Sequence, residues 1–126
     1  MTQEINLPDV LAELTEVFAQ YEEALVNNKV EVLDALFWNS PHTLRYGVAE
    51  VQYGHAAIQA YRAAQPAQGQ PRTLTRTVIT TYGREYGTAN VEFQREGESR
   101  IGRQSQTWLR LPEGWRVVAA HVSLMG

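Results

Sequence analysis

The chain has 126 residues, of which 44% are hydrophobic and 20% charged, and its net charge at pH 7 is −3. This length fits one domain with one core, which we expect to span residues 1–126. The acidic balance argues against a nucleic-acid partner, because such partners usually require a basic face. The absence of cysteine excludes disulfides, thiolate nucleophiles and cysteine-based metal sites.

The N-terminal segment MTQEINLPDV has neither the basic start nor the apolar core of a signal peptide. No apolar run in the chain approaches the ~20 residues that cross a bilayer. We therefore expect a cytoplasmic protein that has no membrane partner.

The beginning of the chain has the pattern of a helix. Pro8 suits the first turn, where its missing N–H costs nothing. The apolar residues that follow recur at three- and four-residue spacing and form one stripe: Val10, Leu11, Leu14, Val17, Phe18, Tyr21 and Leu25. Asn27-Asn28 predicts the end of this helix, because Asn tolerates the left-handed backbone conformation that terminates helices.

Two shorter helices are expected after it. One spans residues 30–37 and ends before the break Asn39-Ser40-Pro41, and the other spans residues 55–64, which are rich in alanine. The segment Gln65–Pro71, with its prolines and glycine, is typical of a loop between elements.

Strand patterns make up the rest of the chain. Two short strands are expected at 43–46 and 50–53, on either side of Gly47. Four longer strands follow at 72–82, 88–96, 100–111 and 114–125, with turns at Gly83, Gly87, Gly97 and Pro112-Glu113-Gly114. This order predicts an α+β fold in which three helices of the N-terminal half pack on one face of a curved antiparallel sheet.

Two polar residues of the first half could belong to a site. Tyr21 lies on the apolar stripe, so its ring should face the sheet, and its hydroxyl either bonds a backbone carbonyl or projects into a cavity. Arg45 faces opposite to Leu44 and Tyr46. It points either to water or into a pocket, where its planar guanidinium could hold a carboxylate with two parallel hydrogen bonds.

The strand at 100–111 is unusual because neither of its faces is apolar. One face carries Arg103, Ser105 and Thr107, and the other carries Gly102, Gln104, Gln106 and Trp108. A polar cavity and an oligomer interface both explain this pattern.

In the last strand, alternation places His121 and Ser123 on the face of Val117 and Ala119. A histidine there is either a core residue with satisfied hydrogen bonds or a catalyst. We find no nucleophile elbow that would support hydrolysis by a serine and a histidine.

Other chemistries have little support. The three histidines lack the spacing that puts two metal ligands on one helix, so we expect no metal, and there is no phosphate-binding loop. The basic scatter of Arg72, Arg76 and Arg84 is interpreted as a solvated face. The acidic residues Glu22 and Glu23 are expected to face solvent, and so is Glu50, although a place in a pocket stays open for it.

Four segments together resemble a known family: FWNSPHTLRYGVAE, YGHAAIQAYR, GRQSQTW and GWRVVAAHVS. With the order of elements, they resemble the SnoaL-like branch of the NTF2-like superfamily and, within it, the AtzH-type and HpxZ-type proteins. The resemblance covers nearly the whole chain. It implies a cone-shaped (cystatin-like) fold whose sheet wraps around the long helix and leaves a pocket at the wide end.

The resemblance to AtzH-type proteins also implies an activity. These are 1,3-dicarboxyurea decarboxylases that yield allophanate and use a tyrosine of the first helix and the arginine of the RYG segment, which correspond to Tyr21 and Arg45. We therefore expect a carboxy-lyase of ureido and cyanuric acid nitrogen catabolism that needs no cofactor. From strand phase and the superfamily's pocket, we infer further substrate-binding residues: Trp38, Arg103, Ser105, His121 and Ser123.

A second interpretation remains open. HpxZ-type proteins accompany amidases of purine and oxalurate catabolism, so the chain could be a non-catalytic protein that binds a small carboxylate or an amidase. NTF2-like domains include both enzymes and binding modules, and the fold alone cannot decide. In either case the expected partners are a small ureido dicarboxylate and further copies of the chain, in a homodimer or a higher homo-oligomer, since the superfamily commonly dimerises through the sheet.

Overall fold

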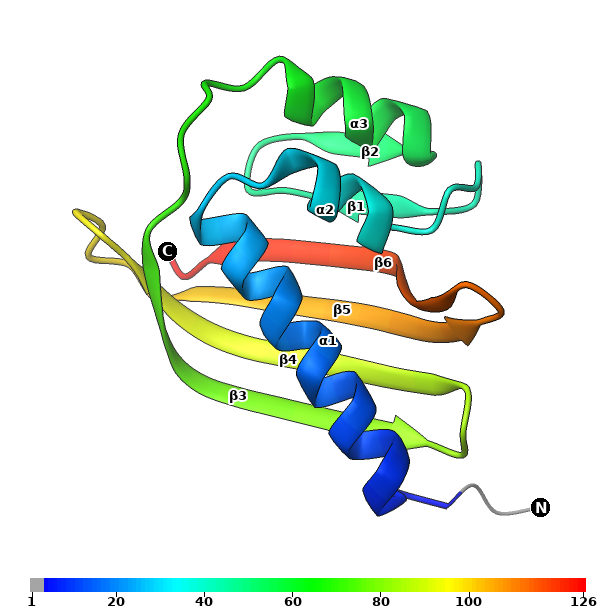
Figure 1. Cartoon of the computed structure of the whole chain (residues 1–126). Coiled ribbons are helices and arrows are strands. Elements are labelled where there is room, and N and C mark those ends of the chain that lie inside the picture. Colours follow the sequence, from blue (N-terminus) through cyan, green and yellow to red (C-terminus); the bar gives the residue numbers. More distant parts are fainter. Residues whose placement is uncertain (1–3) are drawn as a thin grey trace.

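Helix α1 (Pro8–Val26) lies across the sheet and supplies much of the core (Figure 1). The structure, a computed structural model, describes residues 4–126. Pro8 occupies the first turn of the helix, and the buried side chains follow the predicted stripe: Val10, Leu14, Phe18, Tyr21 and Ala24. Just beyond the helix, Asn28 adopts a positive φ of 53°, which confirms the expected left-handed stop.

The next part of the chain forms one edge of the sheet and the two short helices beside it. It contains α2 (Val30–Leu36), β1 (Leu44–Tyr46), β2 (Val51–Tyr53) and α3 (His55–Ala63). The break between α2 and β1 is held by local hydrogen bonds: the Thr43 hydroxyl donates to the Trp38 carbonyl at 2.8 Å, and the His42 N–H donates to the Ser40 hydroxyl at 3.1 Å. This turn directs β1 into the sheet.

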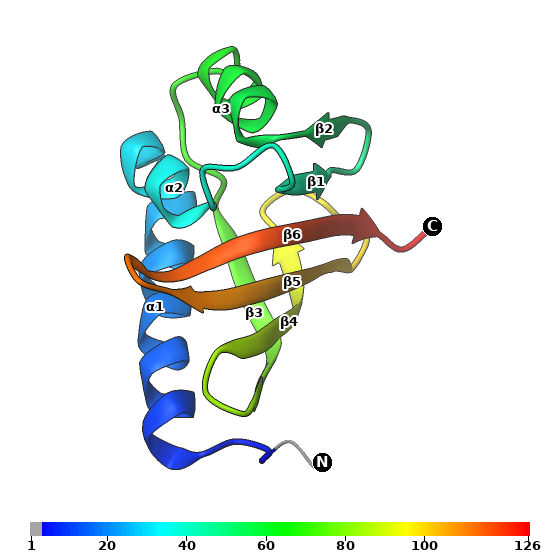
Figure 2. The same cartoon turned by 90° about the vertical axis from the view of Figure 1, so that its right-hand side faces the viewer.

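The four long strands are β3 (Arg72–Tyr82), β4 (Tyr86–Arg95), β5 (Gly102–Leu111) and β6 (Gly114–Leu124). The sheet order is β2-β1-β6-β5-β4-β3, and the sheet curves around α1 (Figure 2). The predicted α+β architecture with three helices on one side is confirmed. The sheet is mixed rather than wholly antiparallel, because β6 returns beside β1 and runs parallel to it.

Gly87 lies inside β4 and not in the predicted turn. The hairpin between β3 and β4 turns earlier, at Gly83, whose φ is 67°. A Cβ atom on Gly87 would collide with the Leu14 side chain of α1. The glycine therefore lets the long helix approach the sheet closely.

An irregularity in the pairing of β5 with β6 changes the phase of the last strand. Thr107 pairs with Ala119, but Trp108 pairs with Val117, so one extra residue of β6 is left unpaired. A bulge of this kind reverses which side chains face the core. The prediction that His121 and Ser123 share a face with Val117 is therefore wrong: Val117 is buried, His121 is exposed and Ser123 is half-buried.

The described part of the chain, residues 4–126, includes no helix with the length and hydropathy needed to cross a membrane.

Candidate functional site

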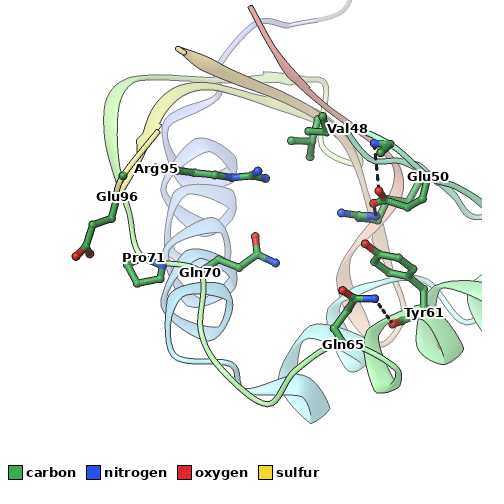
Figure 3. A pocket seen from close by; sticks show the side chains of 12 residues that line it. Val48, Glu50, Tyr61, Gln65, Gln70, Pro71, Arg95 and Glu96 are labelled. Carbon is green, nitrogen blue, oxygen red and sulfur yellow. Dashed lines mark hydrogen bonds and ion pairs between the residues drawn. The ribbon is translucent and has the colours of Figure 1, made fainter. Parts of the chain in front are cut away.

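A cavity opens between α1, α3, the loop 65–71 and the inner face of the sheet. Its enclosed inner part has a volume of about 200 Å³ and its wider outer part about 680 Å³. The two parts share six lining residues, which mark the passage between them: Arg45, Tyr61, Gln65, Gln70, Arg95 and Val122. Figure 3 shows the outer part with side chains converging on it from several elements.

Arg45 points into this cavity, which is one of the two alternatives that the sequence left open for it. Its Nη1 atom donates to Glu50 Oε1 at 2.7 Å and to Gln52 Oε1 at 3.0 Å, and its guanidinium lies 5.5 Å from the centre of the Tyr61 ring. The side chain is only 20% exposed. Nη1 is thus occupied by protein acceptors, while no residue of 4–126 accepts a hydrogen bond from Nε or Nη2.

Glu50 and Tyr61 form the wall around Arg45. Burial alone would raise the pKa of Glu50, but the hydrogen bond and the charge of Arg45 outweigh it and lower that pKa below its ordinary value. Burial, with the charge of Glu50, raises the pKa of Tyr61. At neutral pH Glu50 is therefore an anion and Tyr61 a neutral hydroxyl.

Arg72 and Glu22 form a buried ion pair at the back of the inner cavity. The guanidinium holds both carboxylate oxygens, with Nη2–Oε1 at 2.6 Å and Nε–Oε2 at 3.0 Å, and the Arg72 side chain is 2% exposed. Arg72 Nη1 also donates to Gln104 Oε1 at 3.3 Å. Because this bond fixes the Gln104 amide, its Nε2 group is a buried donor, and no residue of the described chain accepts from it.

Arg95 is the cation of the cavity that lacks a carboxylate partner within residues 4–126. Three of the four arginines that line the inner part have one: Arg45 with Glu50, Arg62 with Asp34, and Arg72 with Glu22. In the inner part of the cavity, four cations against three paired carboxylates leave one positive charge. Burial, together with the charges of Arg72 and Arg45, lowers the pKa of Arg95, so the surplus charge is held in a partly dry, repulsive environment. Such a cavity favours an anion.

Tyr21 lies in the inner part, in the same cavity as Arg45. It is 5% exposed, and its ring packs against Phe18, Phe37 and Trp108 with centroid separations of 6.1, 6.3 and 6.3 Å. No hydrogen bond joins its hydroxyl to another of the described residues. The ring is therefore fixed by the core, while the hydroxyl can serve a ligand.

The remaining sequence-predicted residues do not meet at this cavity. Arg103, Ser105, His121 and Ser123 alternate with buried residues and lie on the outer face of the sheet, where Arg103 pairs with Ser123 and Ser105 with His121. The His121 ring contacts Tyr46 edge-on at 5.5 Å. Trp38 follows α2 and stacks on His42 at 6.4 Å, and neither part of the cavity includes it.

Several residues of the site were missed from the sequence. The assignment of Arg72 to a solvated face and of Glu22 to solvent is wrong, because the two form the buried pair described above. A usable signal existed for Arg95, since it continues the inward phase of Val91 and Phe93 along β4. When alternation along a strand places a cation on the same face as core residues, the cation must point inward. This is a stronger sign of a pocket than a strand with two polar faces is.

Residues 4–126 contain no group of three or more His, Asp or Glu side chains placed to hold a metal ion. What the cavity offers is a set of hydrogen-bond donors and one surplus cation. This arrangement can bind a small carboxylate and donate hydrogen bonds to it.

The known proteins that match this chain have the same fold. The model of the AtzH-like family matches residues 3–126. A crystal structure from Pectobacterium atrosepticum, described as a protein with unknown function from the DUF3225 family, is 54% identical, with a TM-score of 0.94 and coverage of 97% of this chain and 95% of that one. A cystatin-like fold protein from Burkholderia xenovorans is 48% identical, with a TM-score of 0.93 and 98% coverage of both chains.

A more distant match is an NTF2-like superfamily protein from Salmonella enterica, 23% identical, with a TM-score of 0.77 and coverage of 94% of this chain and 92% of that one. At this identity it supports the fold alone. A search of the curated proteins finds no match.

Proposed function

The chain belongs to the AtzH-like family, and from this premise and the chemistry of the cavity we propose that it decarboxylates a small N-carboxylated urea. The substrate would be 1,3-dicarboxyurea and the product allophanate, in the catabolism of ureido and cyanuric acid nitrogen. The observation that carries the proposal is that Tyr21 and Arg45 line one enclosed cavity with a surplus positive charge.

The reaction consumes one proton. The bond between a terminal carboxylate carbon and its nitrogen breaks, its electron pair stays on the nitrogen, and the carboxylate leaves as CO2. The nitrogen takes a proton, so that a dianion and a proton give a monoanion and CO2. Such a step requires orientation of the substrate and a well-placed acid.

Tyr21 is the proposed acid. Its hydroxyl can donate a proton to the nitrogen as the C–N bond breaks. The aromatic packing of Tyr21 fixes the direction of the phenol. Solvent then returns the proton to the phenolate through the outer cavity.

Arg45 is proposed to hold the carboxylate that stays on the product. A cation on the departing carboxylate would stabilise the substrate more than the transition state, because that group loses its charge on the way to CO2. Glu50 occupies Nη1 of Arg45 and leaves the Nε and Nη2 edge for a carboxylate. A planar guanidinium can bind a carboxylate through two parallel bonds at such an edge.

Gln104 is proposed to donate its unpartnered Nε2 group to the central urea oxygen. Negative charge shifts from the departing carboxylate onto the nitrogen and this oxygen in the transition state. A donor that is already fixed, as Gln104 is by Arg72, stabilises that charge without reorganisation. A ligand oxygen would also satisfy the buried donor, which otherwise costs about 1–3 kcal/mol.

The test is CO2 release from dicarboxyurea made in situ, measured with and without purified protein. The proposal predicts release faster than the spontaneous reaction and one CO2 for each allophanate formed. If dicarboxylates only raise the melting temperature and the rate of release stays spontaneous, the protein is a carboxylate-binding module and the enzymatic proposal fails.

A further inference from the structure

We propose that Arg95 binds the second carboxylate of the substrate and thereby makes the site prefer dianions over monoanions of the same size. This inference rests on the proposed function for the identity of the substrate. It adds a residue whose role is recognition of the departing group and not the chemical step.

Arg95 is available for this role because the neighbouring carboxylates are already paired with other arginines. Arg72 lies directly across from it in the pairing of β3 with β4, but both oxygens of Glu22 are held by Arg72. Arg62 likewise holds Asp34 at 2.6 Å. No carboxylate of the described residues lies within ion-pair distance of Arg95, so an anionic group on a ligand would be its partner.

The position of Arg95 also fits. Figure 3 shows Arg95 extending from β4 into the open space, facing Glu50 and Tyr61 on the opposite wall, while Glu96 points away from the cavity. Glu50 is bonded to Arg45. The two arginines that line both parts of the cavity therefore belong to opposite walls, and a small molecule with a carboxylate at each end would join them.

The surroundings of Arg95 favour the binding of an anion to it. Its guanidinium lies 5.5 Å from the centre of the Phe93 ring, and that of Arg72 lies 4.4 Å from the same centre. Two like charges beside one ring repel each other. An anion bound to Arg95 would relieve that repulsion, so part of the binding free energy is stored in the empty site.

The contact between Arg95 and the departing carboxylate affects substrate binding and turnover differently. The carboxylate on Arg95 becomes neutral CO2, so the contact with Arg95 is strong with the substrate and absent with the product. The contact with Arg95 therefore stabilises the bound substrate more than the transition state, so it tightens binding and raises the barrier from the bound complex. Of the two arginines, only Arg45 still holds a carboxylate of the allophanate monoanion, which favours release of the product.

The experiment measures binding of two inert probes by calorimetry. Glutarate has three atoms between its carboxylates, as dicarboxyurea does, and pentanoate is the matched monoanion. In the native protein we expect glutarate to bind at least about tenfold more tightly than pentanoate, since one charge-assisted contact is worth that much. In Arg95→Met this preference should disappear while pentanoate binding stays unchanged.

Two further variants make the result specific. Arg103→Met removes a cation from the outer face of the sheet and should leave the preference intact, while Arg95→Lys keeps the charge without the planar fork and should retain part of it. In the dicarboxyurea assay, Arg95→Met should raise KM about tenfold or more and should raise kcat as well, because the lost contact stabilised the bound substrate more than the transition state.

The inference is overturned if the native protein shows no preference for glutarate, or if Arg95→Met retains it. A native protein that binds glutarate through Arg95 but releases no CO2 would refute the proposed function and leave the recognition role in place. If the native protein releases CO2 but Arg95→Met keeps the preference for glutarate, the recognition role of Arg95 is refuted and the proposed function stands.

Discussion

Replacing Glu22 with glutamine tests whether the ion pair behind the cavity holds the site together. The change keeps the size and helix propensity of the side chain but removes its charge. Arg72 is 2% exposed and would lose the carboxylate that holds both Nε and Nη2. It would also face Arg95 across the strand pair without a neutralising charge.

The magnitude follows from the burial of the two partners. Removing one member of a buried ion pair costs about 3–5 kcal/mol, because the other charge is left without compensation. Glu22 is 17% exposed and glutamine still offers one acceptor oxygen, so we expect a cost below this range, about 2–3 kcal/mol. For a chain of this size that is a drop in melting temperature of roughly 8–12 °C.

The assay is urea unfolding followed by circular dichroism, with Glu23→Gln as the matched control. Glu23 lies next to Glu22 on α1 but forms an exposed pair with Lys29, in which both side chains are about half exposed. Losing that pair should cost less than about 0.5 kcal/mol. If Glu22→Gln costs no more than Glu23→Gln, the reasoning about the buried pair is refuted.

The remaining predictions concern the wall that carries Arg45. Arg45→Lys keeps the charge but loses the planar fork, so kcat/KM for dicarboxyurea should fall by about tenfold or more, and full activity would contradict the proposed clamp. Glu50→Gln should lose stability in a pH-dependent way: the folded-state pKa of Glu50 lies below the ordinary value of 4.5, so its contribution is complete above that pH and is lost as the pH falls through the lower folded pKa. Urea unfolding of both proteins between about pH 7 and 3 should show their difference shrinking on acidification, and a constant difference would oppose this assignment.

Much of the fold could be predicted from periodicity and turn residues. The stripe of α1, the stop at Asn28 and the short strands around Gly47 follow from local patterns that the tertiary structure reinforces. Gly87 was misplaced because a glycine in a turn and a glycine under a crossing helix look the same in sequence. Only the approach of Leu14 distinguishes them.

The candidate site was only partly predictable. Tyr21 and Arg45, identified through the family resemblance, do line one cavity. A single unpaired residue in β6 reverses which face the side chains beyond it occupy. The face of His121 therefore could not be predicted from simple alternation. Arg72 and Arg95 lie far from Glu22 and Arg45 in the sequence, so their relation depends on sheet pairing and helix packing that no local pattern records.

The central claim, that Tyr21 protonates the nitrogen in an enclosed cavity, is tested most directly by the rate of CO2 release in the native protein and in Tyr21→Phe. The phenylalanine ring should keep the packing against Phe18 and Trp108, so glutarate should bind both proteins equally. We predict that Tyr21→Phe binds glutarate normally while its kcat falls by about 100-fold or more, the usual contribution of a positioned acid. An unchanged kcat in Tyr21→Phe, with native binding, would contradict it.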